Sequence, residues 1–143
     1  MARKAQGTKW VVLCKCLLLV AIVAATGFRA YGKGQRITLT QAPHAGAGGA
    51  DRTELISGTV MGFDFSACKI VIYAFAGGTW WVQPTAASPL TRIDGNGAWQ
   101  TITHLGSTYA VLVVKNSNKP PATTADVPTA EGDVLAVKLV PGR

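Results

Sequence analysis

The sequence KIVIYAFAGGTWWVQP, residues 69–84, contains the clearest structural signal in the chain. Two runs of β-branched and aromatic residues flank Ala76-Gly77-Gly78, a pattern typical of a β-hairpin. Neighbouring side chains of a strand point to opposite faces, so Trp80 and Trp81 cannot both lie in one core. Trp80 shares its face with Val82 and is expected to point inward, whereas Trp81 is the better candidate for exposure.

The strand before the glycines is apolar on both faces, so alternation alone does not say which face lies beside Trp81. If Tyr73 and Phe75 share the face of Trp81, the three rings form an aromatic patch bordered by Gln83. A flat indole beside an amide suits a sugar, because the ring packs on the C–H face of a pyranose and the amide binds a hydroxyl. The predicted ligand-binding residues are therefore Trp81, Gln83, Tyr73 and Phe75.

The alternative is a structural role for Trp81. A sandwich needs large side chains in its core, and the polar segment 116–133 carries prolines that pack well on aromatic rings. Exposed aromatic clusters are uncommon unless they are functional. Exposure of the indole would therefore favour binding, and burial would favour a core role.

Similar apolar runs recur between Gly, Pro, Asn and Asp residues, and no window shows convincing helical periodicity. Strands are expected at Leu55–Gly62, Cys68–Phe75, Thr79–Gln83, Leu90–Ile93, Ala98–Thr103, Thr108–Lys115 and Val134–Val140. The DGNG sequence at 94–97 favours a tight turn, and the prolines of 116–133 exclude that segment from a sheet interior. The sequence therefore predicts an all-β domain at 53–143, a single seven-stranded antiparallel β-sandwich of Ig-like or prealbumin-like type.

The first 25 residues have the layout of a secretory signal peptide: basic residues, an apolar run and small residues before Ala25. Cleavage is expected after Ala25, with Ala30 as the second choice. The alternative is an uncleaved membrane anchor helix through residues 10–28. A spanning helix needs about 20 apolar residues, and this segment reaches that length only by burying Lys15. The expected location is secreted or periplasmic, with membrane anchoring as the alternative.

Residues 26–52 are predicted to form a flexible tether. The part at 41–52, QAPHAGAGGADR, is rich in Gly and Ala and has no core-forming residue.

The formal net charge of +7 is concentrated at the front of the chain. Four of the 14 basic residues precede residue 26, which leaves ten against seven acidic residues. Clustered Lys and Arg would be needed to follow a nucleic-acid backbone, and none is visible, so no nucleic acid is expected. Cys68 is the one cysteine after residue 25 and is expected to be a small buried side chain, with a bridge between two chains as the alternative.

The strings ISGTV, KIVIYAF and IDGNGAWQTITHLGSTYAVLVV resemble the prealbumin-like sandwich of carboxypeptidase-regulatory-like modules. The string IYAFAGGTWWVQPTAASPLTRIDGNGAW is similar to a small accessory domain of secreted bacterial proteins, which often also carry glycoside hydrolase or carbohydrate-binding modules. The resemblance covers roughly residues 56–140. It implies a β-sandwich without catalytic residues, and it supplies no ligand.

Catalytic and metal-binding patterns are missing from the sequence. Glycoside hydrolysis uses two carboxylates that flank one site, but the five acidic residues from Leu55 onward all fall in expected turns or loops: Asp64, Asp94, Asp126, Glu131 and Asp133. His44 falls in the predicted tether and His104 between two strands, where a turn or surface position is expected. Neither Cys68 nor His104 belongs to a metal-ligand spacing. The chain is therefore expected not to be an enzyme and to use no cofactor and no metal.

Two further aromatic residues are expected in the core. Trp99 follows the DGNG turn, and Tyr109 begins an apolar strand three residues after Gly106. A buried Tyr109 is expected to hydrogen-bond the backbone through its hydroxyl, as in a tyrosine corner. The leading hypothesis is a secreted, non-catalytic module that binds a polysaccharide or cell-envelope glycan. The alternative is a structural or protein-interaction module of the cell envelope.

Overall fold

A computed structural model describes residues 34–143. The predictions of a signal peptide at 1–25 and of an anchor helix at 10–28 lie outside the described residues. The described part contains strands and no helix, so it has no helix of the length and apolarity needed to cross a membrane.

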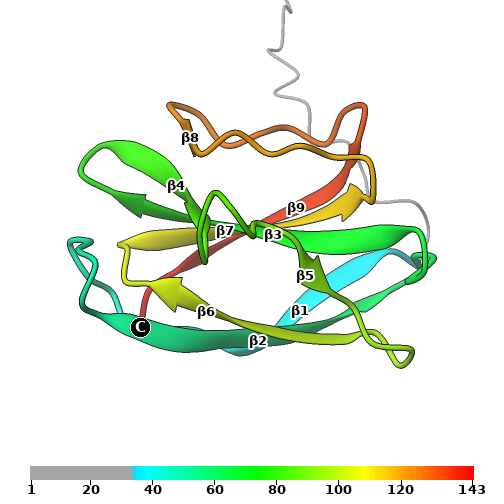
Figure 1. Cartoon of the computed structure of the whole chain (residues 1–143). Helices are drawn as coiled ribbons and strands as arrows, with labels where there is room; N and C mark the ends of the chain where they lie inside the picture. Colours follow the sequence, from blue (N-terminus) through cyan, green and yellow to red (C-terminus); the bar gives the residue numbers. More distant parts are fainter. Residues whose placement is uncertain (1–33) are drawn as a thin grey trace, which may run out of the picture.

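Residues 34–143 form two antiparallel sheets (Figure 1). The strands are β1 (Arg36–Gln41), β2 (Thr53–Met61), β3 (Cys68–Ala76), β4 (Thr79–Gln83), β5 (Thr91–Arg92), β6 (Ala98–His104), β7 (Thr108–Lys115), β8 (Thr123–Thr124) and β9 (Val134–Pro141). The smaller sheet has the order β1-β2-β6. The larger sheet has the order β8-β4-β3-β7-β9, and the short β5 pairs with the first part of β3.

The two sheets face each other across one hydrophobic core, which gives a sandwich-like arrangement. Ile56 and Trp99 of the smaller sheet belong to the same buried cluster as Ile72 and Val111 of the larger sheet. Trp99 pairs with Gly58 across β2 and β6, where a Cβ on Gly58 would come within 2.7 Å of the indole carbon Cζ2. Glycine at this position therefore makes room for the expected core tryptophan.

The larger sheet is also buried on its other face. There a second cluster, which includes Val71, Tyr73 and Leu112, packs against Val127 of the segment between β7 and β9. Figure 1 shows this segment, in orange, running over the outer face of the larger sheet. This covering explains why β3 is apolar on both faces: each face contacts a different layer.

The described part contains nine strands where the sequence predicted seven. The seven expected strands are all present, and β1 and β8 are additional. The prediction of a flexible tether is wrong for residues 34–52. Residues 36–41 pair with β2, Ile37 is buried, and the backbone of Ala45 donates a hydrogen bond to the carbonyl of Arg143. The tether prediction rested on the Gly- and Ala-rich composition of 41–52, which shows neither the pairing of 36–41 with β2 nor the backbone contacts of the following residues.

The two predicted turns are present. Gly77 and Gly78 both have positive φ angles and close the hairpin between β3 and β4. In the DGNG turn, the Gly97 N–H donates to the Asp94 carbonyl, and the Asp94 N–H donates to the Ala98 carbonyl. The Gly97 carbonyl accepts a hydrogen bond from Val60 of β2, which ties the turn to the smaller sheet.

We expect Gly97→Ala to lower the free energy of unfolding by about 1–3 kcal/mol. Gly97 has a φ of +84°, and its Cβ would lie 2.3 Å from the Val60 carbonyl oxygen. Gly95→Ala, two residues earlier in the same turn, meets nothing within 4 Å and needs no positive φ. Urea unfolding of both variants measures the difference. Equal stabilities would contradict this account of the turn.

Candidate functional site

The two sheets approach each other differently at their two edges. At one edge, Lys138 of β9 donates a hydrogen bond from Nζ to the Ile37 carbonyl of β1 at 3.1 Å. At the other edge, β4 faces β6, and the side chain of Gln83 joins them. The candidate site lies at this second edge.

Gln83 is 3% exposed, and its side-chain amide makes hydrogen bonds to both sheets. Its oxygen accepts the His104 backbone N–H and is also 2.9 Å from His104 Nδ1, and its nitrogen donates to the Trp81 carbonyl. Because a backbone N–H can only donate, the amide oxygen faces β6, and Nδ1 of His104 must donate as well. A neutral His104 therefore has an unprotonated Nε2, which has no partner among the described residues.

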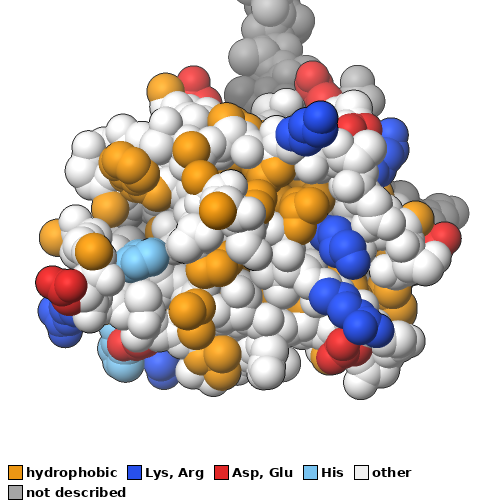
Figure 2. Space-filling model, in the orientation of Figure 1, with side chains coloured by type: hydrophobic (Ala, Val, Ile, Leu, Met, Phe, Trp, Pro, Cys, Tyr) orange, Lys and Arg blue, Asp and Glu red, His pale blue; other side chains and the backbone are white. Residues whose placement is uncertain are grey.

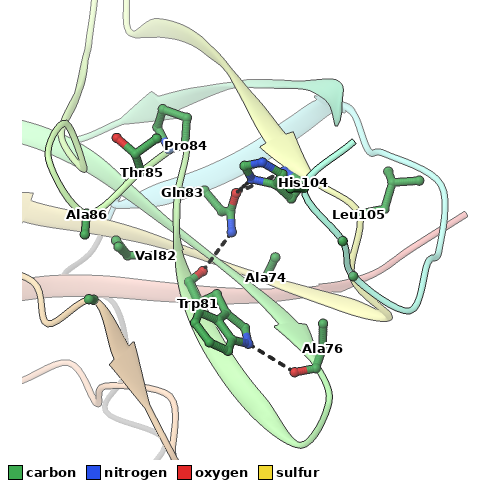
Figure 3. Close-up of a pocket in the computed structure, with 14 residues that line it drawn as sticks. Ala74, Ala76, Trp81, Val82, Gln83, Pro84, Thr85, Ala86, His104 and Leu105 are labelled. Atoms are coloured by element: carbon green, nitrogen blue, oxygen red, sulfur yellow. Dashed lines mark hydrogen bonds between the residues drawn. The ribbon is translucent and has the colours of Figure 1, made fainter. Parts of the chain in front are cut away.

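A cavity of about 500 Å³ opens beside this contact (Figure 3). We call it the β4–β6 cavity. Its lining comes from β3, β4, the end of β6 and four connecting segments: Gly48, Gly49, Ala50, Ala74, Ala76, Trp81, Val82, Gln83, Pro84, Thr85, Ala86, His104, Leu105 and Ala122. None of these residues is Lys, Arg, Asp or Glu, and only Gln83, Thr85 and His104 have polar side chains other than the indole. The cavity therefore suits an uncharged ligand with apolar surface.

Trp81 lies at the exposed side of this cavity. Its side chain is 50% exposed, and its indole N–H donates to the Ala76 carbonyl at 3.2 Å (Figure 3). Ala74 is the cross-strand partner of Trp81, and Ala76 lies on the same face one step further along β3. These methyl side chains are too small to cover the ring. The indole is thus held by its polar atom, while part of its carbon surface stays open.

The predicted aromatic patch is wrong, because Tyr73 and Phe75 lie on the other face of the sheet. Tyr73 pairs with Val82 and Phe75 with Trp80, and cross-strand partners share a face. Tyr73 is fully buried, and its hydroxyl donates to the Pro121 carbonyl. The Phe75 ring packs against Trp80, with the ring centroids 5.0 Å apart. Of the four predicted residues, only Trp81 and Gln83 are brought together in the cavity.

The assignment of faces along β4 is confirmed. Trp80 and Val82 are buried, and Trp81 is the exposed member of the tryptophan pair. Gln83 differs from expectation in one respect: its amide is buried and joined to His104 rather than free at the border of a patch. Trp99 is buried as predicted, and Tyr109 is fully buried.

One wall of the cavity comes from residues 48–50, and the segment before them is fixed at several points. The Tyr109 hydroxyl donates to the His44 carbonyl and accepts the Gly106 N–H, as a tyrosine-corner role predicted. Burial raises the pKa of Tyr109. Glu54 accepts hydrogen bonds from the backbone N–H and the ring of His44, which lower the pKa of Glu54. These contacts hold the wall against the sandwich.

The sequence interpretation missed His104 and the 48–50 wall. His104 was expected in a turn, but it is the last residue of β6, half-buried and part of the cavity lining. The length of the loop between β3 and β4 could have shown which residues of β3 lie beside Trp81. Gly77 and Gly78 form a two-residue loop, and a loop of that length sets Ala74 opposite Trp81. No comparable signal marks residues 48–50.

Comparison of the chain with protein-family models, with curated proteins and with solved structures found no match. Residues 34–143 contain no group of three or more His, Cys, Asp or Glu side chains placed to hold a metal ion. Cys68 is buried, and burial raises the pKa of its thiol. What the cavity can do chemically is therefore inferred from its own lining.

We expect Tyr73 to ionise only at strongly alkaline pH. Burial raises its pKa to about 12, whereas an exposed tyrosine ionises near a pKa of about 10. A pH titration of the tyrosine ring carbons by NMR, with Tyr73→Phe to assign the signal, measures this value. An ordinary pKa would contradict the burial of the Tyr73 hydroxyl.

Replacing Glu54 with glutamine should destabilise the chain at neutral pH but not in acid. The carboxylate has a lowered pKa in the folded chain. Its stabilising contribution is therefore present above the ordinary glutamate pKa of about 4.3 and is lost as the pH falls through the lowered value. Unfolding midpoints of wild type and Glu54→Gln measure this convergence. Glu131→Gln is the control, because the Glu131 side chain makes no hydrogen bond or ion pair among the described residues. A constant difference across the pH range would contradict the role of the carboxylate.

Proposed function

We propose that this chain is a non-catalytic module that binds an uncharged glycan, either a polysaccharide or a glycan of the cell envelope, in the β4–β6 cavity. The observation that carries the proposal is the half-exposed indole of Trp81, held by its N–H beside a cavity without charged side chains. An indole face packs well on the C–H face of a sugar ring. His104 and Thr85 also line the cavity and supply a small number of polar atoms to orient such a ligand.

The same proposal covers location and architecture. The signal-like pattern of residues 1–25 supports a secreted or periplasmic protein. In this hypothesis β2–β7 and β9 are a prealbumin-like, seven-stranded core, to which β1 and β8 are additions. An accessory role beside glycan-degrading enzymes fits the resemblance of residues 56–140.

A second candidate function is contact with a protein partner. Leu55 and Ile102 are cross-strand partners on β2 and β6, and they are 36% and 52% exposed. Neither lines the β4–β6 cavity. Figure 2 shows hydrophobic side chains spread over the face in view, whereas most of the Lys and Arg side chains lie towards its right-hand side. Because Ile102 lies outside the cavity, it also supplies a control for the glycan hypothesis.

Trp81→Ala should weaken glycan binding at least about tenfold, which corresponds to the loss of about 1.4 kcal/mol of stacking energy. Affinity electrophoresis of the chain through gels that contain a panel of neutral polysaccharides measures the change. Ile102→Thr removes a comparably exposed apolar side chain away from the cavity and should leave the retardation unchanged.

Two results would contradict the proposal. No retardation by any glycan would remove the sugar-binding function, and a protein partner would then be favoured. Equal losses in Trp81→Ala and Ile102→Thr would place binding outside the cavity. Circular dichroism of each variant shows whether the fold is retained.

A further inference from the structure

We infer that the β4–β6 cavity selects a sugar that carries an acetamido group, so that its ligand is a glycan of N-acetylated amino sugars. This inference rests on the proposed function and names the class of sugar for the same site. It follows from three properties of the lining: its small apolar floor, its few polar side chains and the hydrogen-bonding atoms that remain unused.

The floor beside Trp81 is built from methyl groups. Ala74 lies opposite Trp81 in the strand register, and Ala76 lies on the same face. Gly48 packs closely over Ala76, since a Cβ on Gly48 would come within 2.8 Å of the Ala76 Cβ. The space that remains beside the indole has an apolar surface. A methyl group of the ligand fits such a surface, whereas a hydroxyl placed there would lose its water without a replacement.

Few groups in the cavity can satisfy the hydroxyls of an ordinary hexose. Three lining side chains are polar: Gln83, Thr85 and His104. Most of the Gln83 amide is engaged with His104 and the Trp81 carbonyl, and Thr85 Oγ1 accepts the Ser88 N–H. A buried hydroxyl left without a partner loses its hydrogen bonds to water and so weakens binding. A ligand that exchanges one hydroxyl for a group with an apolar part therefore fits better.

The unused polar atoms match an amide. Nε2 of neutral His104 is an acceptor, and the second N–H of the Gln83 amide is a donor; neither has a partner among the described residues. An acetamido group offers one N–H donor, one carbonyl acceptor and one methyl group. These can bind His104, Gln83 and the alanine floor respectively. The lining has no carboxylate to pair with a free amine and no cation to pair with a uronic acid.

Calorimetric titration of the full chain with three tetrasaccharides tests the inference. The ligands are the β-1,4-linked tetramers of N-acetylglucosamine, glucosamine and glucose, which differ only in the substituent at carbon 2. We expect the acetylated tetramer to bind at least tenfold more tightly than either of the others. Ala76→Leu should abolish this preference, because its side chain fills the space beside the indole.

The outcomes separate the inference from the proposed function. Equal affinity for the glucose and N-acetylglucosamine tetramers would overturn the acetamido preference and leave neutral glycan binding intact. Preference for the glucosamine tetramer would also overturn it, since the cavity would then be selecting a cation. Binding of none of the three tetramers and of no polysaccharide would overturn both. The comparison of ligands on the unaltered chain decides the matter even if Ala76→Leu fails to fold.

Discussion

The hydrogen bonds of the Gln83 side-chain amide hold the candidate site together. The amide lies at the edge where β4 and β6 meet, and its oxygen accepts two hydrogen bonds from His104. A buried amide without hydrogen bonds would lower the free energy of unfolding by about 1–3 kcal/mol. Separation of β4 from β6 would break the hydrogen bonds to His104, so this contact holds the two sheets at a fixed distance at this edge. It also sets the orientation of the His104 ring, and through the Trp81 carbonyl it fixes the backbone that carries the exposed indole. The cavity, its polar atoms and its aromatic wall are thus positioned together.

The two faces of β4 serve different purposes because different layers cover them. Trp80 and Val82 face the segment between β7 and β9 and complete the second hydrophobic cluster. Trp81 and Gln83 face the space between the sheets, where β6 ends and small side chains leave an opening. The adjacent tryptophans therefore have separate roles: Trp80 stabilises the fold, and Trp81 remains available to a ligand.

Seven of the nine strands in the described part could be predicted from local sequence, because runs of β-branched and aromatic residues between glycine turns are typical of strands. The sequence did not show which face of β3 lies beside Trp81 of β4, because both faces of β3 are apolar and alternation cannot distinguish them. The two-residue Gly77-Gly78 loop contained that information, because a loop of this length fixes the register and with it the partner of Trp81. The packing of β1 and of residues 42–50 depends on backbone hydrogen bonds to distant segments, such as Gly46 to Gly106, which composition does not reveal. The contact between His104 and Gln83 also joins segments far apart in the sequence, so the sequence alone did not reveal it.

The most direct test of the account is iodide quenching of tryptophan fluorescence in a chain with Trp10 replaced by phenylalanine. Three tryptophans then remain, and only Trp81 is exposed, at 50% against 8% for Trp80 and 3% for Trp99. We expect one quenchable component, which disappears in Trp81→Phe and persists in Trp80→Phe. Quenching that survives Trp81→Phe, or that is lost in Trp80→Phe alone, would reverse the two faces of β4 and contradict the proposed site.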